Sequence, residues 1–133
     1  MTFKTYLVED NPVIRENLVG FLEDVADATV VAHAAGEREA VDWLAHHRDG
    51  WDMAIVDLFL EEGNGLGVLD AVRRRAAHQK VVVLSNYATA DMRKRCAQLG
   101  ADAVFDKSNE IDALVDYCIE ITARQGGSAQ ASL

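Results

Sequence analysis

The 133-residue sequence contains no long apolar run and no disulfide framework. None of its apolar runs approaches the ~18 residues of a membrane-spanning helix, and the N-terminus MTFKTYLVED lacks the apolar core of a signal peptide. Its two cysteines, Cys96 and Cys118, are far apart in the sequence and form no Cys-x-x-Cys pair. We therefore expect a protein of the cytoplasm that does not act at a membrane.

Basic residues are scarce as well, because 13 Lys and Arg stand against 22 Asp and Glu, for a formal net charge of −9. Most of the acidic excess lies in residues 1–66, which hold 14 acids and 4 bases, whereas residues 67–133 hold 8 acids and 9 bases. Affinity for nucleic acid depends on Lys and Arg side chains that neutralise phosphates. We therefore expect that this domain does not bind nucleic acid.

The sequence does contain five short apolar runs that alternate with amphipathic stretches, at residues 6–8, 29–32, 53–56, 81–84 and 103–105. The runs are rich in β-branched residues, as is typical of strands that are buried on both faces of a parallel sheet. The stretches between them repeat apolar residues at helical spacing; the first such stripe holds Ile14, Leu18, Phe21, Leu22 and Val25. This alternation predicts a doubly wound α/β fold, a five-stranded parallel sheet with helices on both faces.

The length of the chain fits a single domain, since domains typically hold roughly 100–150 residues. We expect the domain at residues 1–124, followed by a flexible C-terminal tail of small and polar residues at 125–133. Asn11 followed by Pro12 predicts the start of the first helix, because asparagine is a good N-cap and proline suits the first helical position.

Polar side chains follow four of the five predicted strands at the point where each strand ends. Because the strands of a parallel sheet run the same way, their carboxyl ends meet at one edge, and ligands of such folds bind there. The residues expected at this edge are Glu9, Asp10, Asp57, Ser85, Asp106 and Lys107.

This combination of side chains indicates phosphoryl chemistry with a metal ion. Carboxylates a few ångströms apart raise one another's pKa unless a cation lies among them, and hard oxygen ligands suit Mg²⁺. Lys107 adds a second positive charge, and Ser85 can donate a hydrogen bond to an anion. Transfer of a phosphoryl group to a carboxylate depends mostly on positioning and charge neutralisation, which these groups can supply.

Four segments occur in the order and spacing of one known family: LVEDN at 7–11, IVDLFLEEGNGL at 55–66, VVVLSNYA at 81–88 and GADAVFDKS at 100–108. Over residues 4–121 the sequence resembles the receiver domain of bacterial two-component response regulators. The resemblance implies a sheet of strand order 2-1-3-4-5 and an aspartate that accepts a phosphoryl group. It also implies a signalling protein, which is an enzyme only in catalysing its own phosphorylation and dephosphorylation.

Carried over by position, the resemblance implies that Asp57 is the phosphoryl acceptor. Asp10 and Asp57 would bind Mg²⁺ directly, and Glu9 would act mainly through a metal-bound water. The backbone carbonyl of Phe59 would complete the ligands that the protein supplies. Lys107 matches the family's lysine that pairs with the phosphoryl oxygens.

Ser85 matches the family's switch hydroxyl, but its surroundings depart from the usual pattern. The family often has an aromatic residue three positions before the lysine, where this chain has Val104; Phe105 follows one position later. The switch that the resemblance implies therefore consists of Ser85, Val104 and Phe105. Asn86 stands where a small residue is common, which predicts narrower access to the phosphoryl group. Residues 61–62, two glutamates, replace a Pro-Gly-like start of the loop after the acceptor.

The resemblance also implies partners: a sensor histidine kinase or histidine phosphotransfer protein as the donor, and a downstream protein as the target. The acyl phosphate would pull Ser85 inward and shift the face made by the fourth helix, fifth strand and fifth helix. We expect two phosphorylated copies to be able to pair through this face as a homodimer. Its charged residues are Arg93, Lys94, Arg95, Asp112, Asp116 and Glu120.

Two other functions stay open as alternatives. An aspartate-nucleophile phosphatase also uses a strand-end carboxylate with Mg²⁺, but such enzymes favour an Asp-x-Asp pair, whereas Glu9 and Asp10 are adjacent and Asp57 is followed by Leu58 and Phe59. The other alternative is an interaction module that works without phosphorylation. The intact set of polar residues at the sheet edge favours the receiver over such a module.

Overall fold

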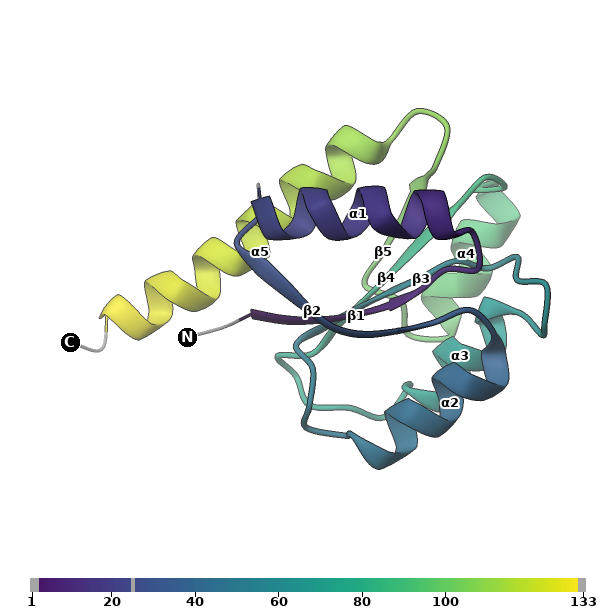
Figure 1. The fold of residues 1–133 in the computed structure, drawn as a ribbon, viewed down its shortest axis with the longest axis horizontal. Helices are drawn as coiled ribbons and strands as arrows, with labels where there is room; N and C mark the ends of the chain where they lie inside the picture. The colour runs from purple at the N-terminus through teal and green to yellow at the C-terminus, as the bar shows by residue number, and fades with distance from the viewer. Residues whose placement is uncertain (1–2, 25, 132–133) are drawn as a thin grey trace.

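The computed structural model describes residues 3–24 and 26–131, with side chains described as far as residue 124. Strands and helices alternate along it (Figure 1): β1 (Phe3–Val8), α1 (Pro12–Asp24), β2 (Ala28–Ala34), α2 (Glu37–His46), β3 (Met53–Val56), α3 (Gly65–Ala71), β4 (Lys80–Ser85), α4 (Ala90–Gln98), β5 (Ala103–Asp106) and α5 (Ile111–Ala131). The predicted alternation is confirmed at all five strands.

The strands form one sheet of order β2-β1-β3-β4-β5, in which every neighbouring pair is parallel. This confirms the predicted doubly wound sheet and its strand order. Val8 at the end of β1 lies opposite Val56 at the end of β3, and Ser85 lies opposite Asp106. The carboxyl ends of the central strands are therefore level, and the residues that follow them emerge side by side.

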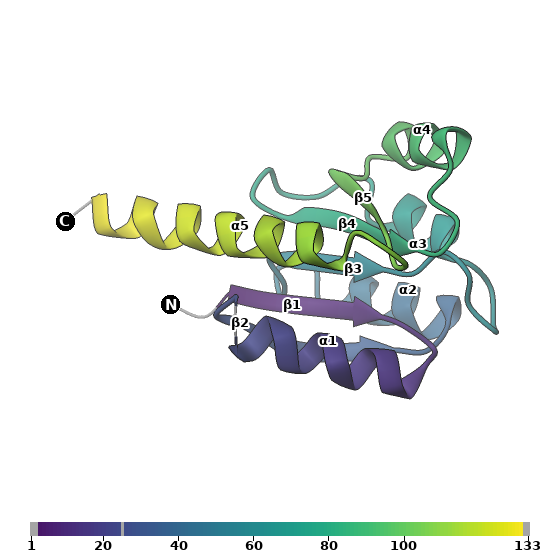
Figure 2. The same cartoon turned by 90° about the horizontal axis from the view of Figure 1, so that it is seen from above.

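Helices cover both faces of the sheet, with α1 and α5 on one face and α2, α3 and α4 on the other (Figures 1 and 2). Successive residues of β4 point to opposite faces, so that Val83 belongs to the core under α2, α3 and α4, and Val82 to the core under α1 and α5. All four residues of β3 are buried. Burial on both faces explains why the central strands are continuously apolar.

The N-terminus of α1 is capped as the sequence predicts. The side-chain oxygen of Asn11 accepts hydrogen bonds from the backbone N–H groups of Val13 at 2.9 Å and Ile14 at 3.2 Å. Phe21, however, is 47% exposed, so its assignment to the buried stripe is wrong. At about 100° per residue, Phe21 is rotated by about 60° from Leu18 and about 100° from Leu22, the two residues of α1 that are buried. Val25 lies outside the described residues.

Cys96 and Cys118 are free, fully buried thiols, one in each of the two cores. α5 extends past the body of the sheet (Figure 2) and continues as helix to Ala131, across most of the segment 125–133 for which the sequence predicts a flexible tail. The flexibility of that segment and the domain boundary at residue 124 stay predictions. Among residues 3–24 and 26–131, no helix is long and apolar enough to cross a membrane.

Candidate functional site

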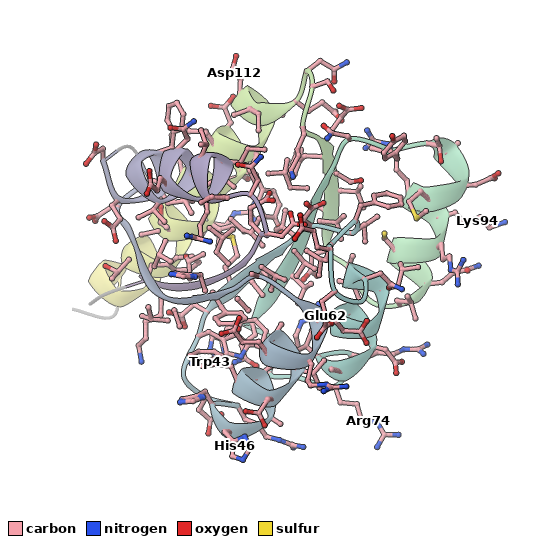
Figure 3. The ribbon with its side chains drawn as sticks, turned by 45° about the vertical axis from the view of Figure 1, so that its right-hand side comes forward. Trp43, His46, Glu62, Arg74, Lys94 and Asp112 are labelled. Atoms are coloured by element: carbon pink, nitrogen blue, oxygen red, sulfur yellow. The ribbon has the colours of Figure 1, made fainter. Side chains whose placement is uncertain are left out.

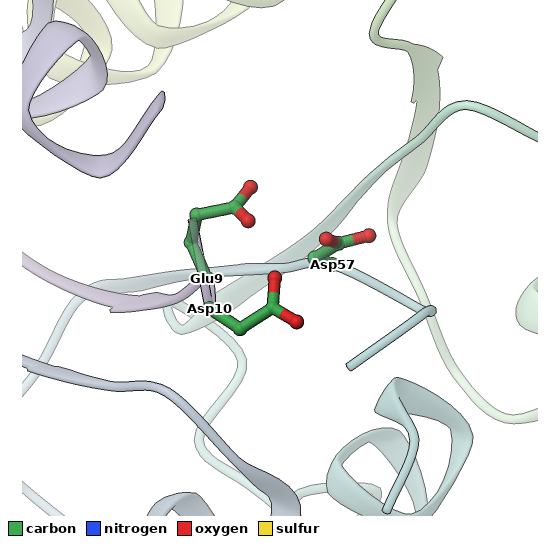
Figure 4. A group of neighbouring side chains, drawn as sticks. All are labelled: Glu9, Asp10 and Asp57. Carbon is green, nitrogen blue, oxygen red and sulfur yellow. The ribbon is translucent and has the colours of Figure 1, made fainter. Parts of the chain in front are cut away.

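Three carboxylates meet where β1 and β3 end (Figure 4). Glu9 and Asp10 follow β1, Asp57 follows β3, and one oxygen of each carboxylate lies within 4.8 Å of the others. The sheet holds their backbones, because Glu9 N donates to Ala34 O at 2.9 Å and Asp57 N donates to Val8 O at 3.0 Å. The parallel pairing thus continues one residue past each strand and sets the carboxylates side by side.

Lys107, in the loop after β5, reaches two of these carboxylates. Its Nζ lies 2.8 Å from Asp57 Oδ2 and 2.6 Å from Glu9 Oε1. The side chains are buried, with exposed fractions of 8% for Lys107, 7% for Asp57 and 1% for Glu9. Buried charges persist only when they are paired, so this lysine is what permits two carboxylates to lie inside the domain.

The electrostatics of the cluster shift two pKa values. Burial raises the pKa of Glu9, a hydrogen bond from Lys107 and one from the backbone of Asn11 oppose this rise, and the charge of Asp57 adds to it. Burial alone would lower the pKa of Lys107, but its hydrogen bonds and charge interactions with Asp57 and Glu9 outweigh burial and raise it. Lys107 therefore stays cationic at neutral pH, whereas Glu9 binds a proton more readily than an ordinary glutamate.

The donor set fits a magnesium ion. Lys107 brings a single positive charge to a cluster of three carboxyl groups, and carboxylates this close together repel one another unless a further cation lies among them. Carboxylate oxygens are the ligands that Mg²⁺ prefers. The cluster opens into a cavity of about 180 Å³, room for several waters at ~30 Å³ each. The cavity is lined by Glu9, Asp10, Asn11, Ile14, Asp57, Phe59, Asn86, Tyr87 and Lys107.

The loop after β3 is tied to both aspartates. Glu61 N donates to Asp10 Oδ2 at 2.9 Å, and Phe59 N donates to Asp57 Oδ1 at 3.3 Å. The loop closes on itself through an antiparallel bridge between Phe59 and Asn64. The backbone of Phe59, whose carbonyl the resemblance implies as a metal ligand, is therefore held beside the acidic cluster.

Two exposed aromatic rings flank the cavity. Phe59 is 50% exposed and Tyr87 is 61% exposed, and their rings meet edge to face with centroids 4.9 Å apart. Sequence reasoning did not assign Tyr87 to the site. A signal was present, since Tyr87 is a large aromatic residue only two positions after Ser85 and precedes the helical repeat of α4.

Ser85 does not line the cavity. Its side chain is fully buried, and its hydroxyl accepts a hydrogen bond from Tyr87 N at 3.1 Å. The two residues named with it as the switch lie on opposite faces of the sheet: Val104 packs against the core under α2, α3 and α4, whereas Phe105 packs against the other core and contacts the ring of Tyr117 on α5. The alternation of side chains along β5 requires this separation.

Arg93 joins the three elements of the expected output face. Its guanidinium donates to the backbone carbonyls of Ala88 at 3.0 Å and Val104 at 2.8 Å, and to the carboxylate of Glu110 at 2.5 Å. The sequence suggested only a basic run over residues 93–95. The structure separates Arg93, which holds α4 to β5 and to the start of α5, from its exposed neighbours.

The fold and the site together define an α/β domain with an acidic pocket and a buried lysine at the carboxyl edge of a parallel sheet. The family model of the response regulator receiver domain matches residues 6–118. The chain therefore belongs to the family of response regulator receiver domains, which confirms the resemblance seen in its sequence.

Individual relatives agree with this assignment. Response regulator Rre1 of Synechocystis sp. is 34% identical over 127 residues, which are 94% of this chain and 54% of the relative. Response regulator VraR of Staphylococcus aureus is 23% identical over 87% of this chain and 54% of its own length. This chain thus spans about half the length of the curated relatives it matches.

Solved structures share the fold. A LuxR-family response regulator from Aurantimonas sp. has a TM-score of 0.79 at 24% identity, with 92% of this chain and 86% of that chain covered. The complex of CheX with CheY from Borrelia burgdorferi, which holds BeF₃ and Mg²⁺, has a TM-score of 0.74 at 18% identity, with 86% of this chain and 88% of that chain covered.

Proposed function

We propose that this domain accepts a phosphoryl group on Asp57 and that the phosphorylated state changes which proteins it binds. The observation that carries the proposal is the buried contact of Lys107 with Asp57 beside Glu9 and Asp10, in a cavity open to a donor. Family membership and the likeness in fold to a CheX–CheY complex that holds BeF₃ and Mg²⁺ support it.

The residues of the site have distinct roles in the proposed reaction. A carboxylate oxygen of Asp57 attacks the phosphorus of a phosphohistidine or of acetyl phosphate, the bond from phosphorus to the leaving group breaks, and the leaving group departs with its electron pair. Lys107 pairs with the charge on the transferred phosphoryl oxygens. Asp10, Asp57, the Phe59 carbonyl and, through water, Glu9 would hold Mg²⁺, which supplies charge neutralisation when it is bound.

The alternatives have less support. An aspartate-nucleophile phosphatase favours an Asp-x-Asp pair. In this site the two acids after β1, Glu9 and Asp10, are instead adjacent in the sequence, and both belong to the cluster. An interaction module that works without phosphorylation has no need for a lysine buried between two carboxylates, whose burial costs free energy.

The partners belong to the same proposal. A sensor histidine kinase or a histidine phosphotransfer protein supplies the phosphoryl group, and a downstream protein reads the face of α4, β5 and α5. Of the expected charges on this face, Arg93 already pairs with Glu110 of the same chain. A phosphorylation-dependent homodimer would therefore pair the exposed Lys94 and Arg95 of one copy with exposed acids such as Asp112 and Asp116 of the other. The cytoplasmic location also stays part of the proposal.

The proposal is tested by incubating the protein with acetyl phosphate, with and without Mg²⁺, and measuring its intact mass. We expect a Mg²⁺-dependent gain of one phosphoryl group by the wild type and by Asp70→Asn, a control at an exposed aspartate of α3, and no gain by Asp57→Asn. Absence of any gain in the wild type would refute the proposal and favour the interaction module. Continuous release of phosphate from p-nitrophenyl phosphate would favour the phosphatase.

A further inference from the structure

The N-terminus of α2 takes its cap from a different part of the chain. Its N-cap residue, Gly36, has no side chain that could accept a hydrogen bond. Glu62, in the loop after the acceptor, supplies the acceptors instead: its carboxylate oxygens lie 3.3 and 3.4 Å from Arg38 N, and its backbone carbonyl accepts from Glu37 N at 3.0 Å. Figure 3 shows Glu62 against one end of α2 and His46 at the other.

Glu37 makes the return contact. Glu37 lies in the first turn of α2, and its carboxylate accepts a hydrogen bond at 2.8 Å from Asn64 N. Asn64 belongs to the acceptor loop, residues 57–64, which joins β3 to α3. Two glycines make room for this side chain, since a Cβ at Gly63 would lie 2.4 Å from Glu37 Cβ and a Cβ at Gly67 would lie 2.2 Å from Glu37 Oε2. Two glutamates thus exchange hydrogen bonds between α2 and the acceptor loop.

The same loop touches the acidic cluster. Glu61, the residue before Glu62, donates its backbone N–H to Asp10 Oδ2, and the bridge from Phe59 to Asn64 closes the loop. The contacts of Glu62 and Glu37 therefore hold the loop at residues 62 and 64, directly after its link to Asp10. This accounts for the glutamate at residue 62, where the family pattern starts the loop differently, whereas Glu61 contributes through its backbone N–H.

We propose that Glu37 and Glu62 are positioning residues for the acceptor site: they hold the loop so that Asp10 and the Phe59 carbonyl are in place for Mg²⁺ before it binds. The inference rests on the proposed function, because it concerns the metal of that reaction. Without the two carboxylates, binding of Mg²⁺ must also order the loop, and the entropy of ordering lowers the affinity. Residues that orient metal ligands from outside the ligand set typically change affinity by roughly 10–100-fold when they are removed.

The test measures the Mg²⁺ dissociation constant of the unphosphorylated protein by calorimetry, and the Mg²⁺ dependence of acetyl phosphate labelling. The variant Glu37→Ala/Glu62→Ala removes both acceptors, and Glu37→Gln/Glu62→Gln removes the charges but keeps a carbonyl oxygen at each position. The control Glu39→Ala/Asp42→Ala removes two acids from α2, which contact Ala35 and His46 and do not reach the loop. Thermal melts check whether each variant is folded.

We expect the alanine variant to bind Mg²⁺ about tenfold more weakly than the wild type. We expect the glutamine variant to lie close to the wild type, and the α2 control to match the glutamine variant. Labelling at saturating Mg²⁺ should reach the same rate in all three. If the alanine variant does not fold, the single variant Glu62→Ala takes its place.

Three results would overturn the inference: unchanged affinity in the alanine variant, equal weakening by glutamine, or equal weakening by the α2 control. The last two would assign the effect to lost negative charge and not to position. Failure of the proposed function looks different, because the wild type itself would then neither bind Mg²⁺ nor gain a phosphoryl group, and the inference would fall with it.

Discussion

Substituting the buried lysine tests the electrostatic account of the site most directly. Lys107→Met keeps most of the side-chain volume but removes the charge that lies 2.6 Å from Glu9 and 2.8 Å from Asp57. Removing one partner of a buried ion pair typically costs roughly 3–5 kcal/mol, because the remaining charge is left unpaired. Since Glu9 can bind a proton in response, we expect the free energy of unfolding to fall by about 3 kcal/mol at neutral pH.

The raised pKa of Glu9 determines how the loss of stability in Lys107→Met changes with pH. The pKa of Glu9 is raised in the folded protein, so this group favours folding most when it is protonated and loses that contribution as the pH rises through its folded pKa. Without Lys107, the hydrogen bond that lowers this pKa is lost and the pKa rises further. The stability deficit of Lys107→Met should therefore become smaller as the pH is lowered from 7 to 5.

Urea unfolding without Mg²⁺, followed by the fluorescence of the two tryptophans, of which Trp51 is buried, measures the effect. At a slope of about 2 kcal/mol per molar urea, the expected loss moves the midpoint down by about 1.5 M. Lys94→Met is the control, because Lys94 is exposed on α4 (Figure 3) and its removal should change stability by at most about 0.5 kcal/mol. The reasoning is refuted if both substitutions cost the same, or if the cost of Lys107→Met does not shrink at pH 5.

Two further predictions concern the glycines and the thiols. Gly65→Ala would place a Cβ 2.3 Å from the carbonyl oxygen of Asp57 and should lower the free energy of unfolding by about 3 kcal/mol. Gly20→Ala would meet nothing within 4 Å and should raise the free energy of unfolding by about 0.5–1 kcal/mol, because alanine favours a helix more than glycine does. Effects of the same sign in urea unfolding would contradict this prediction. Burial raises the pKa of Cys118 to about 12 and also raises the pKa of Cys96. We therefore expect neither thiol to react with Ellman's reagent at pH 8 until urea unfolds the protein. Fast labelling of the native protein would contradict this prediction, because it would show that a thiol is accessible.

The local pattern of the sequence predicts most of the fold and most of the residues that belong to the site. Strand runs such as residues 53–56 are apolar because they are buried on both faces, and this burial is visible in composition alone. The residue that follows each strand lies at the carboxyl edge whatever the details of packing, which is why Asp57 and Lys107 could be assigned to one site. The resemblance to receiver domains then implied a role for each of these residues.

The Phe21 assignment shows the limit of such patterns. Helical spacing permits several residues to share a stripe, but a neighbouring layer covers only part of it, and the position of that layer is set by contacts with residues far away in the sequence. Phe21 lies outside the covered part and is exposed. The same limit applies to residues 93–95, where only Arg93 turns inward to bind backbone carbonyls.

The sequence by itself determined the alternation of strands and helices, the edge at which the polar residues meet, and the family. Only the tertiary structure decided how those residues are paired: the lysine buried between Glu9 and Asp57, and the exchange of hydrogen bonds between Glu37 and the loop that carries Glu62. The physical reason is distance along the chain. Periodicity reports which face of an element is buried, whereas a hydrogen bond between residues 24 or 50 positions apart depends on how separate elements pack.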